Sequence, residues 1–490
     1  MQDAGAPEMG YSAGRRPKMK RGVIYDVLYG FVPITGWEEE IINSPFFQRL
    51  RWIKQLSFAN YIFPGAEHNR FGHTIGVMHS MDQMLRALGL AVPDNELFDP
   101  KATSPEAMLH KSLRISALMH DIGTFPFSHT VEYAYMRHGN DARRLPERAK
   151  NLQNNHEHLG AFIIKNTRYE GGITRILEDA GIDVAMISKI IKGESPYMVA
   201  NQLMHSDLDA DRMDYLLRDS YYTGIQYGQF DRDYILANLT TFELGRGQVG
   251  FGVRENAMRA VEDFLIARFN WYSQVIKNPQ SSKFDVISTR IAERFLDEDL
   301  MYQFHDLLSM IEERDERFFW WNDIYFLNRC QEVRHLGLMD DAYTQELIGM
   351  LLFRKAPKTV HHPEFEHRIL ESTGSEKERE RRIKRIQAIV RDFESVIEEA
   401  GTGKEWILAD IPGKDIAFTA SRERLNKKER KGPLYLEQEP VKIVTKRAGV
   451  KLLIEIENSI VKRLSHYINF VPNVYANEAA MKLFKAKKLL

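Results

Sequence analysis

The chain has 490 residues, with 67 basic against 68 acidic side chains and a single cysteine, Cys330. This length exceeds what one hydrophobic core usually serves, roughly 250–300 residues, so we expect two or three packed units. The charge balance gives no indication of a nucleic-acid or membrane partner, and one cysteine excludes a disulfide framework and a cysteine-rich zinc site. No run approaches the roughly 20 apolar residues of a membrane span and no signal peptide is evident, so we expect a cytoplasmic protein.

Four units are expected in chain order, and the fold class is mainly α. Residues 1–19, rich in Gly, Ala, Pro and basic side chains, predict a flexible lead-in. Residues 20–280 predict a helical core with one small hairpin, because apolar residues recur there at spacings of three and four. Residues 281–400 predict peripheral helices. The sequence pattern changes from helical to strand-like at residues 401–490, which predicts a small α+β subdomain.

Capping signals mark two helices of the core. Ser44-Pro45 supplies a cap and a first-turn proline for a helix that runs to Leu56. Ser104-Pro105 does the same for a helix that closes on His120-Asp121. Further helices are expected over 73–90, 201–219 and 254–277, and a hairpin over 241–253.

The last third of the chain predicts three strands and a helix. The strands are expected at 406–408, 441–444 and 451–456, and the helix at 459–470. The aromatic run at 318–321 predicts a packing patch between domains or subunits. The mixed charges at 376–385 predict a solvated helix face.

Histidine and aspartate recur in four separate segments of the core: 70–73, 120–123, 156–157 and 209–215. The adjacent His120-Asp121 pair offers one imidazole nitrogen and one carboxylate oxygen to the same cation. A second histidine upstream and an aspartate downstream complete a four-ligand set without sulfur. Such a set suits Mn, Fe, Mg, Zn or Ni and leaves positions open for water and a phosphate oxygen, as hydrolysis requires.

Each piece alone also has an ordinary interpretation. His73 follows the surface-like stretch 67–70 and could simply begin a helix, and the aspartates after residue 206 could form a solvated face. Against this, His120-Asp121 ends an apolar helix, where burial of unpaired ionisable groups is costly. If one helix continues through this region, Asp207 and Asp211 share a face and repel, so a cation or an arginine partner is expected.

Longer runs join these segments into a family pattern. They are SPFFQRLRWIKQL (44–56), FPGAEHNRFGH (63–73), HDIGTFPFSH (120–129), NHE (155–157) and DADRMDYLLRD (209–219). In this order the sequence resembles the HD-domain superfamily of metal-dependent phosphohydrolases, and within it the deoxynucleoside triphosphate (dNTP) triphosphohydrolases. The resemblance covers about residues 22–280. It implies an HD-domain helical core that hydrolyses dNTPs at the α-phosphorus, giving a deoxynucleoside and inorganic triphosphate.

The resemblance also implies a role for particular residues. One divalent cation per subunit would be held by His73, His120, Asp121 and Asp211, with a second Mg²⁺ accompanying the nucleotide. The substrate would be bound by Arg70 and Arg212 at the phosphates and by Gln55, Tyr215 and Asp219 at the deoxyribose. The acid–base cluster would comprise His129, Glu132 and His156, with Glu157 beside it.

The sequence departs from the family pattern at several positions, among them Glu132, where an aspartate is more common, and Arg212, where a lysine is usual. Thr124 stands where a second histidine, a proposed proton donor, is usual. Threonine cannot donate a proton at neutral pH, so three outcomes are open: His129 or His156 takes over, the rate is low, or the substrate differs. Ile276 and Asn278 stand where a tyrosine and a histidine are common, which alters contacts to the nucleotide.

Regulation by a nucleotide bound between subunits is a further implication of the resemblance. Gln48 and Arg51 match the allosteric pocket, Val23 lies in a degenerate form of the segment that lines it, and Asn43 replaces an acidic residue that reads guanine. The expected partners are therefore dNTPs, a regulatory nucleotide and further copies of the chain, in a tetramer or hexamer. The ordinary alternative is that these residues only cover helix surfaces.

Several other functions stay open. The same metal chemistry could act on another nucleotide, or Thr124 could mark a catalytically weak nucleotide sensor. The basic loop 422–431 could bind single-stranded nucleic acid, although such loops are usually only solvated, and no nucleic-acid partner is expected. Residues 245–250 match G-x-G-x-x-G, but in a hairpin rather than a βαβ unit. Pool balance, mutation avoidance and starvation of an invading phage are all compatible cellular roles.

Overall fold

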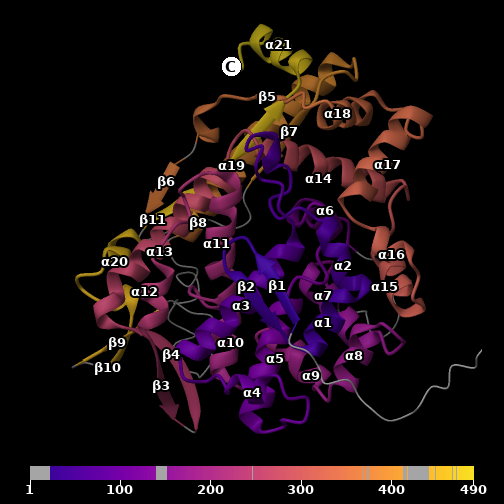
Figure 1. Ribbon diagram of the computed structural model, residues 1–490. Helices are drawn as coiled ribbons and strands as arrows, with labels where there is room; N and C mark the ends of the chain where they lie inside the picture. Colours follow the sequence, from indigo (N-terminus) through magenta and orange to yellow (C-terminus); the bar gives the residue numbers. More distant parts are fainter. Residues whose placement is uncertain are drawn as a thin grey trace, which may run out of the picture.

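The computed structural model describes residues 22–139, 152–245, 247–366, 368–371, 375–411, 416–417, 441–446, 449–465, 467–470 and 472–490. Helices dominate this part of the chain and the sheets are small, which confirms the predicted mainly α fold class (Figure 1). The predicted lead-in at 1–19 and the basic loop at 422–431 lie outside the described residues. None of the described helices is long and apolar enough to cross a membrane.

The N-terminal segment is a hairpin followed by a capped helix. Strand β1 (Gly22–Asp26) pairs antiparallel with β2 (Gly30–Ile34) on the outside of the molecule. Helix α1 (Gly36–Asn43) follows, and its capping box at Thr35 satisfies two backbone N–H groups that a helix start would otherwise leave unpaired. This hairpin was not among the predicted elements.

The helix predicted from Ser44 is shorter than expected. Ser44 does accept a backbone N–H of the first turn, but its helix α2 (Pro45–Gln48) tightens at once into the 3₁₀ turn Arg49–Trp52. The chain then becomes extended at Ile53, with φ −121° and ψ 115°. The prediction of a helix as far as Leu56 is therefore wrong, because the chain turns there to bring the next segment against the core.

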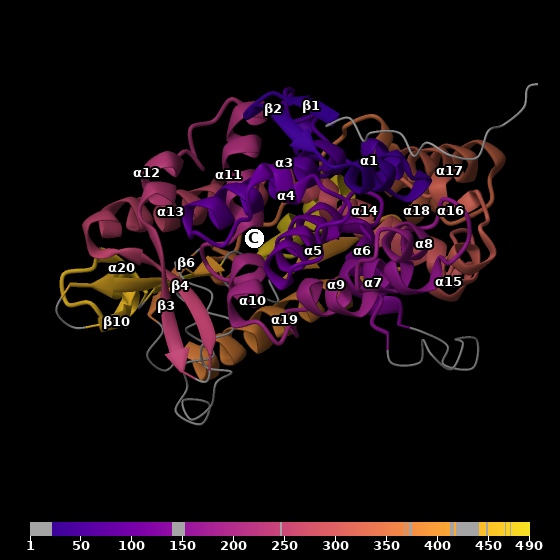
Figure 2. The same ribbon diagram turned by 60° about the horizontal axis from the view of Figure 1, so that its bottom comes forward.

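Three helices form the centre of the molecule. Helix α3 (Arg70–Ala87) packs against both α5 (Pro105–Met119) and α11 (Ala210–Thr223) (Figure 2). Each begins at a polar side chain that accepts a first-turn backbone N–H: Asn69, Ser104 and Asp209. The helices predicted to contain His73 and to begin at Ser104 are confirmed, with ends shifted by a few residues.

The single helix predicted over 201–219 is wrong. The structure has α10 (Met198–His205), a break, and then α11. Ser206 is extended, with ψ 172°, and Asp209 caps α11 by accepting a backbone N–H at 2.8 Å. An aspartate that satisfies a helix start competes with helix continuation, which explains the break.

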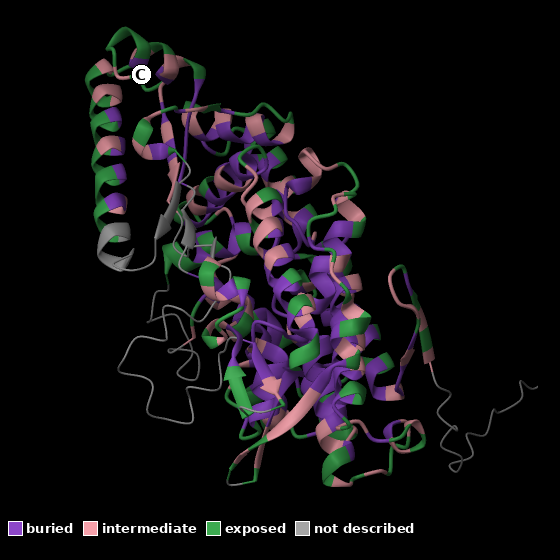
Figure 3. Cartoon of the chain, turned by 90° about the vertical axis from the view of Figure 1, so that its left-hand side faces the viewer, coloured by how far each residue is buried: buried purple, intermediate pink, exposed green. Residues whose placement is uncertain are grey.

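Further helices surround these three. They are α4 (Asp94–Leu97), α6 (His129–His138), α7 (His156–Asn166), α8 (Ile173–Asp179), α9 (Val184–Ile191), α12 (Arg232–Ala237), α13 (Met258–Trp271), α14 (Ser282–Asp297), α15 (Phe304–Glu313), α16 (Arg317–Trp320), α17 (Asp323–Leu336), α18 (Ala342–Leu352), α19 (Ser375–Ala400), α20 (Ile460–Leu464) and α21 (Glu478–Ala486). Helix α13 covers the first part of the helix predicted over 254–277, and a π-helical turn continues it. Figure 3 shows the long α19 at the edge of the molecule, with its outer face exposed.

The hairpin predicted over 241–253 is confirmed. Strand β3 (Leu239–Gly245) pairs antiparallel with β4 (Gln248–Arg254), and β9 (Lys442–Thr445) and β10 (Gly449–Leu452) extend the same sheet. The G-x-G-x-x-G run therefore lies at a hairpin turn. Two further sheets each hold three strands: β6 (Arg368–Glu371), β11 (Tyr467–Phe470) and β8 (Ile416–Ala417), then β5 (Lys358–Thr359), β12 (Asn473–Ala476) and β7 (Ile407–Asp410). Strands from both sides of residue 400 thus share sheets.

Two C-terminal predictions are wrong in part. The strand expected over 451–456 ends at Leu452 and passes into a 3₁₀ turn. The helix expected over 459–470 ends at Leu464, and the following residues form β11 instead. Pairing with β6 and β8 decides this, since strand formation depends on partners that local sequence does not reveal.

The aromatic run at 318–321 is divided between core and surface. Phe318 and Trp321 are buried in the main core, whereas Trp320 is 70% exposed. The ring of Trp321, from the region predicted as peripheral helices, packs against Phe125 and Tyr135 of the predicted helical core. This contact agrees with the predicted packing patch between units, whereas the exposed Trp320 ring has no such place in the core.

Candidate metal centre and active site

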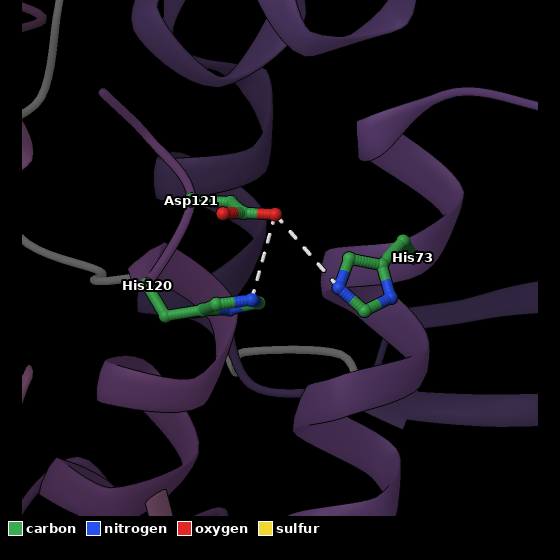
Figure 4. Close-up of side chains that lie close together, drawn as sticks. All are labelled: His73, His120 and Asp121. Atoms are coloured by element: carbon green, nitrogen blue, oxygen red, sulfur yellow. Dashed lines mark ion pairs between the residues drawn. The ribbon is translucent and has the colours of Figure 1, made fainter. Parts of the chain in front are cut away.

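Two imidazoles and a carboxylate meet in the helical core. His73 lies in the first turn of α3, His120 is the C-cap of α5, and Asp121 follows it. One ligand atom of each lies within 4.8 Å of the others. Asp121 Oδ2 is 3.8 Å from His73 Nε2 and 3.5 Å from His120 Nε2 (Figure 4).

Asp211 adds a second carboxylate from the first turn of α11. Its Oδ1 lies 3.0 Å from His73 Nε2 and 3.7 Å from His120 Nε2. The structure therefore brings together all four residues named from the sequence as metal ligands, from three well-separated segments. The side chain of Asp211 is 35% exposed, whereas that of His73 is fully buried, so the cluster opens to solvent on the Asp211 side.

The state of His73 fits a bound cation. Its Nδ1 is 2.8 Å from Asp214 Oδ2, which directs Nε2 toward the cluster, and Nε2 has no hydrogen-bond partner in the described part of the chain. The carboxylates around His73 attract positive charge: burial lowers the pKa of His73, but Asp211 and Asp214 outweigh it and raise that pKa to about 9. A cation at Nε2 would therefore take the place of a proton. His120 Nδ1 likewise lies 2.8 Å from the Ala117 carbonyl, which leaves Nε2 for the cluster. Two nitrogens and two oxygens suit Mn, Fe, Mg, Zn or Ni.

Asp214 is a member of this site that the sequence did not single out. Besides contacting His73, it accepts a hydrogen bond from the Tyr29 hydroxyl at 2.9 Å and two from Arg218 at 2.9 and 3.0 Å. It had only been counted among crowded acidic residues. Asp207, from the same group, lies outside the cluster in the break before α11, where the Arg268 guanidinium donates to it at 2.8 Å.

Arg70 places a positive charge beside the candidate ligands. It is buried, and its guanidinium donates to Asp121 Oδ2 at 2.5 Å and to Ser128 Oγ at 3.0 Å. Burial opposes ionisation of Asp121, but Arg70, with the neighbouring histidines, holds the Asp121 pKa well below its usual range. The site can therefore attract an anionic group such as a phosphate next to the candidate cation.

A second cluster combines His129, Glu132 and His156. Glu132 Oε2 is 2.6 Å from His129 Nδ1, and Glu132 Oε1 is 2.7 Å from both Nδ1 and the backbone N of His156. Burial raises the pKa of Glu132, but the two histidines outweigh it and hold that pKa well below its usual range. Burial lowers the pKa of His156, but Glu132 outweighs it and raises that pKa to about 9. The structure thus brings these three residues together as one hydrogen-bonded unit.

Three buried polar atoms mark the place expected for the sugar. Gln55 Oε1, the Tyr215 hydroxyl and Asp219 Oδ2 have no hydrogen-bond partner among the described residues. They are linked to one another: His68 accepts the Gln55 N–H at 3.0 Å through its carbonyl, and its Nε2 lies 2.8 Å from Asp219 Oδ1. Tyr215 lies one helical turn before Asp219. Buried polar atoms are seldom left unpaired, so this place fits a polar ligand.

His68 is a site residue that sequence reasoning missed. The stretch 67–70 was interpreted as surface, yet His68 is only 6% exposed and its ring stacks on Tyr222 at 4.6 Å. That interpretation is also wrong for Arg70, which is buried. Alternating polar residues concealed both, and only their partners on distant segments reveal them.

Two expected residues lie less centrally. The Arg212 guanidinium donates to the Ser206 carbonyl at 2.9 Å and to Asp209, so it is held at the break before α11. Glu157 is exposed beside His156. Neither position excludes contact with a bound nucleotide, but both differ from the close packing of the two histidine clusters.

Thr124 is fixed in the loop after the His-Asp pair. Its side chain is buried, and its hydroxyl donates to the Asp121 carbonyl at 2.7 Å. Its own carbonyl accepts from the buried Arg49 guanidinium at 2.7 Å. The residue that replaces the usual histidine therefore supports the loop through its hydroxyl and its carbonyl.

The residues expected at an allosteric pocket are near the surface. Arg51 donates to Gln48 at 2.8 Å, and its guanidinium lies 3.5 Å from the centre of the Phe71 ring. Asn43 lines a cavity of about 570 Å³ between the start of α2 and α8. Val23 is 53% exposed on the β1–β2 hairpin. In the described part of the chain, no set of hydrogen bonds or ion pairs links all four residues, Gln48, Arg51, Asn43 and Val23, to one another.

Comparison with known proteins gives a family for the central region. A family model described as HD domain matches residues 70–219. The uncharacterized protein MJ1154 of Methanocaldococcus jannaschii is 34% identical over 257 residues, which cover 52% of this chain and 46% of that protein. The human deoxynucleoside triphosphate triphosphohydrolase SAMHD1 is 26% identical over 302 residues, 56% of this chain and 44% of that one.

The full-length fold also has a solved counterpart. A phosphohydrolase from Bacteroides thetaiotaomicron superposes with a TM-score of 0.63 and 19% identity, covering 94% of this chain and 100% of that one. At this identity the likeness concerns the fold alone. The chain spans about half the length of the curated relatives that it matches.

Proposed function

Because this chain belongs to the HD-domain phosphohydrolases and resembles the dNTP triphosphohydrolases among them, we propose that it hydrolyses dNTPs to a deoxynucleoside and inorganic triphosphate. One observation carries the proposal: His73, His120, Asp121 and Asp211 converge from separate helices, with a buried arginine alongside. This combination serves phosphate chemistry better than a structural role, because the cluster is open to solvent on one side.

The residues around the cluster have different roles in the reaction. When bound, a divalent cation supplies polarisation of a phosphate oxygen and a lower pKa for water. Arg70 neutralises charge on the triphosphate, a role suited to a guanidinium already oriented by Asp121 and Ser128. His129 or His156 gives a proton to the 5′-oxygen of the leaving deoxynucleoside as the bond from that oxygen to the α-phosphorus breaks.

The unpaired buried atoms suit a sugar with a free 3′-hydroxyl, to which Gln55 and Asp219 would bind. A preference for deoxyribose would depend on the buried Tyr215, whose ring would crowd a 2′-hydroxyl. A site built to hydrogen-bond a substrate hydroxyl discriminates strongly against analogues that lack it. Removal of the 3′-hydroxyl should therefore weaken binding more than a change of base.

Regulation belongs to the same proposal. The chain acts as a homo-oligomer, a tetramer or hexamer, that is controlled by a nucleotide bound near Gln48 and Arg51. Asn43 argues against a strict requirement for guanine, because an amide does not reproduce the pairing of a carboxylate with the guanine N–H groups. Sedimentation velocity with and without each dNTP would test the assembly.

The direct test is a substrate panel with product analysis. The full chain is incubated with each dNTP, singly and mixed, with Mn²⁺ or Mg²⁺, because a regulated enzyme can be inactive on one nucleotide. We expect inorganic triphosphate and a deoxynucleoside in equal amounts, and little turnover of the ribonucleotides. Release of pyrophosphate or orthophosphate would indicate a different phosphohydrolase, and no product in any mixture would contradict the enzyme.

A weak nucleotide sensor is the second candidate, and Thr124 is the observation that favours it. Thr124→His distinguishes the two. A large gain in turnover would identify a degenerate wild-type site, as a sensor requires. We expect no gain, because this position is 3% exposed and its side chain is already bound to the Asp121 carbonyl.

A further inference from the structure

The turn that precedes His129 has an unusual backbone. Phe127 and Ser128 have φ values of +50° and +54°, in the left-handed region that residues other than glycine rarely adopt. His129 is the first residue of α6, so this turn sets where its imidazole lies. Two such residues in succession persist only when their surroundings hold them in place.

A carboxylate from outside the HD-domain match is one of the groups that hold this turn. Asp323 Oδ1 accepts the Phe127 N–H at 2.6 Å, across 196 positions of sequence. Its other oxygen accepts the Lys54 N–H at 2.9 Å, across 269 positions. The Ser128 hydroxyl closes the arrangement by donating to the Lys54 carbonyl at 2.8 Å. One buried side chain therefore ties the turn before His129 to the segment that carries Gln55.

The residues just before Asp323 make a second tie to the same loops. The Trp321 carbonyl accepts from Arg49 at 2.9 Å. The other terminal nitrogen of Arg49 donates to the carbonyls of Ile122 at 3.2 Å and Thr124 at 2.7 Å, directly after the His-Asp pair. The segment 321–323 thus lies against the loops of both histidine clusters, although it follows the family match by about a hundred residues.

We infer that Asp323 is a positioning residue for the active site: its carboxylate fixes the Phe127–Ser128 turn, and through it the imidazole of His129. The inference rests on the proposed function in one respect only, namely that His129 transfers a proton in the reaction. The competing explanation is that the other contacts of the turn are sufficient. The Phe127 ring stacks on Phe58 at 4.1 Å and contacts Phe326, and the Ser57 hydroxyl donates to the Phe127 carbonyl at 3.1 Å. In that case Asp323 would contribute to stability and nothing else.

Asp323→Asn and Asp323→Ala separate these explanations, with Glu262→Gln as a matched control. The asparagine keeps one acceptor oxygen but turns an N–H toward the other donor, and the alanine removes both acceptors. Glu262 is also buried and also accepts a distant backbone N–H, that of Ile460 at 2.8 Å, but it lies away from the turn. If Asp323→Asn and the control lose a comparable amount of Tm, a difference in kcat between them cannot be explained by stability.

We expect kcat to fall about 10-fold in Asp323→Asn and about 100-fold in Asp323→Ala, since a displacement of about 1 Å at a reacting group can cost that much. Metal content should stay at the wild-type level in both. The Glu262→Gln variant should keep its kcat. Equal kcat in Asp323→Asn and the control would overturn the inference.

A measurement that needs no activity separates this inference from the proposed function. Hydrogen exchange at the Phe127 amide and modification of His129 by diethylpyrocarbonate, read by peptide mass spectrometry, report the turn directly. We expect both rates to change at least about threefold in Asp323→Asn and to stay constant in the control. If the wild-type chain hydrolyses no dNTP, the proposed function fails, and unchanged rates would refute the positioning role independently.

Discussion

The two histidine clusters both combine imidazoles with carboxylates but differ in spacing. In the first, the imidazole Nε2 atoms of His73 and His120 stand 3.0–3.8 Å from the carboxylate oxygens of Asp121 and Asp211. In the second, Glu132 lies 2.6 and 2.7 Å from the Nδ1 atoms of its two histidines. The first set therefore leaves room for a cation at its centre, whereas the second is already closed by hydrogen bonds that carry protons.

The two clusters also differ in how far their histidines are exposed to solvent. The side chain of His73 is fully buried, which suits a ligand that must keep its position. The side chain of His129 is 55% exposed, which suits a group that exchanges protons with substrate and water. Amino-acid type alone does not divide these roles, so both clusters count as potential metal sites until their distances are known.

The largest expected effect follows from removing a candidate metal ligand. We expect His120→Gln to lose bound metal and to lower kcat by a factor of about 1,000 or more, because the site loses both a donor and its charge stabilisation. Metal content by mass spectrometry and dNTP turnover measure this. His138→Gln is the control, since His138 is a partly exposed histidine that pairs with Asp297 at the surface. Full metal content in His120→Gln would contradict the assignment.

A change in the second cluster should affect turnover without affecting metal. We expect Glu132→Gln to lower kcat about 100-fold, since general acid–base groups contribute about that much or more. Metal content should be unchanged, because none of the three residues belongs to the first cluster. If Glu132→Gln loses metal as His120→Gln does, the two clusters are one site and the comparison fails.

A smaller effect is expected behind His73. Asp214→Asn should weaken metal binding by about 10- to 100-fold, since the partner of a ligating histidine fixes its orientation and basicity. The chain offers a matched control: Asp82 of α3 contacts His110 Nε2 of α5 at 2.9 Å, outside the site. Competition with a chelator measures the affinity. If Asp82→Asn weakens metal binding equally, the effect of Asp214→Asn is explained by general destabilisation of the protein.

Local signals in the sequence predicted much of this arrangement, and contacts between distant segments set its limits. The roles of Ser104 and the His120-Asp121 pair could be predicted because a cap and a helix end are decided by neighbouring residues. The buried state of His68 was not, because its partner Asp219 is 151 positions away. The break at Asp209 was concealed for another reason: an aspartate there could equally be a surface residue of a continuous helix.

The C-terminal part shows the same limit in its sheets. Strand β11 was predicted as helix because an apolar run of this length fits both periods. Its partners β6 and β8 lie far away in sequence, and their backbone groups decide the outcome. The role inferred for Asp323 could not be predicted either, since it depends on two backbone N–H groups contributed by other segments.

The smallest expected effect concerns stability and pH in the second cluster. Burial lowers the pKa of His156, but Glu132 outweighs it and raises that pKa to about 9, above its ordinary 6.5. The stability from this shift is fully present below about pH 6.5 and is lost as pH rises through about 9. Glu132 has a lowered pKa, so its own contribution is present above its ordinary 4.5 and is lost in acid.

The difference in Tm between wild type and Glu132→Gln should therefore be greatest near pH 6 and smaller at pH 9.5, by roughly 1–4 °C. Scanning fluorimetry of chelator-treated protein at both values measures it. Glu262→Gln is again the control, because Glu262 pairs with Arg259, which stays charged throughout, so its difference should not change between the two values. An equal difference at pH 6 and pH 9.5 for Glu132→Gln would mean that His156 does not titrate against Glu132. The second cluster would then be a fixed hydrogen-bonded structure, and the proton for the leaving group would have to come from elsewhere.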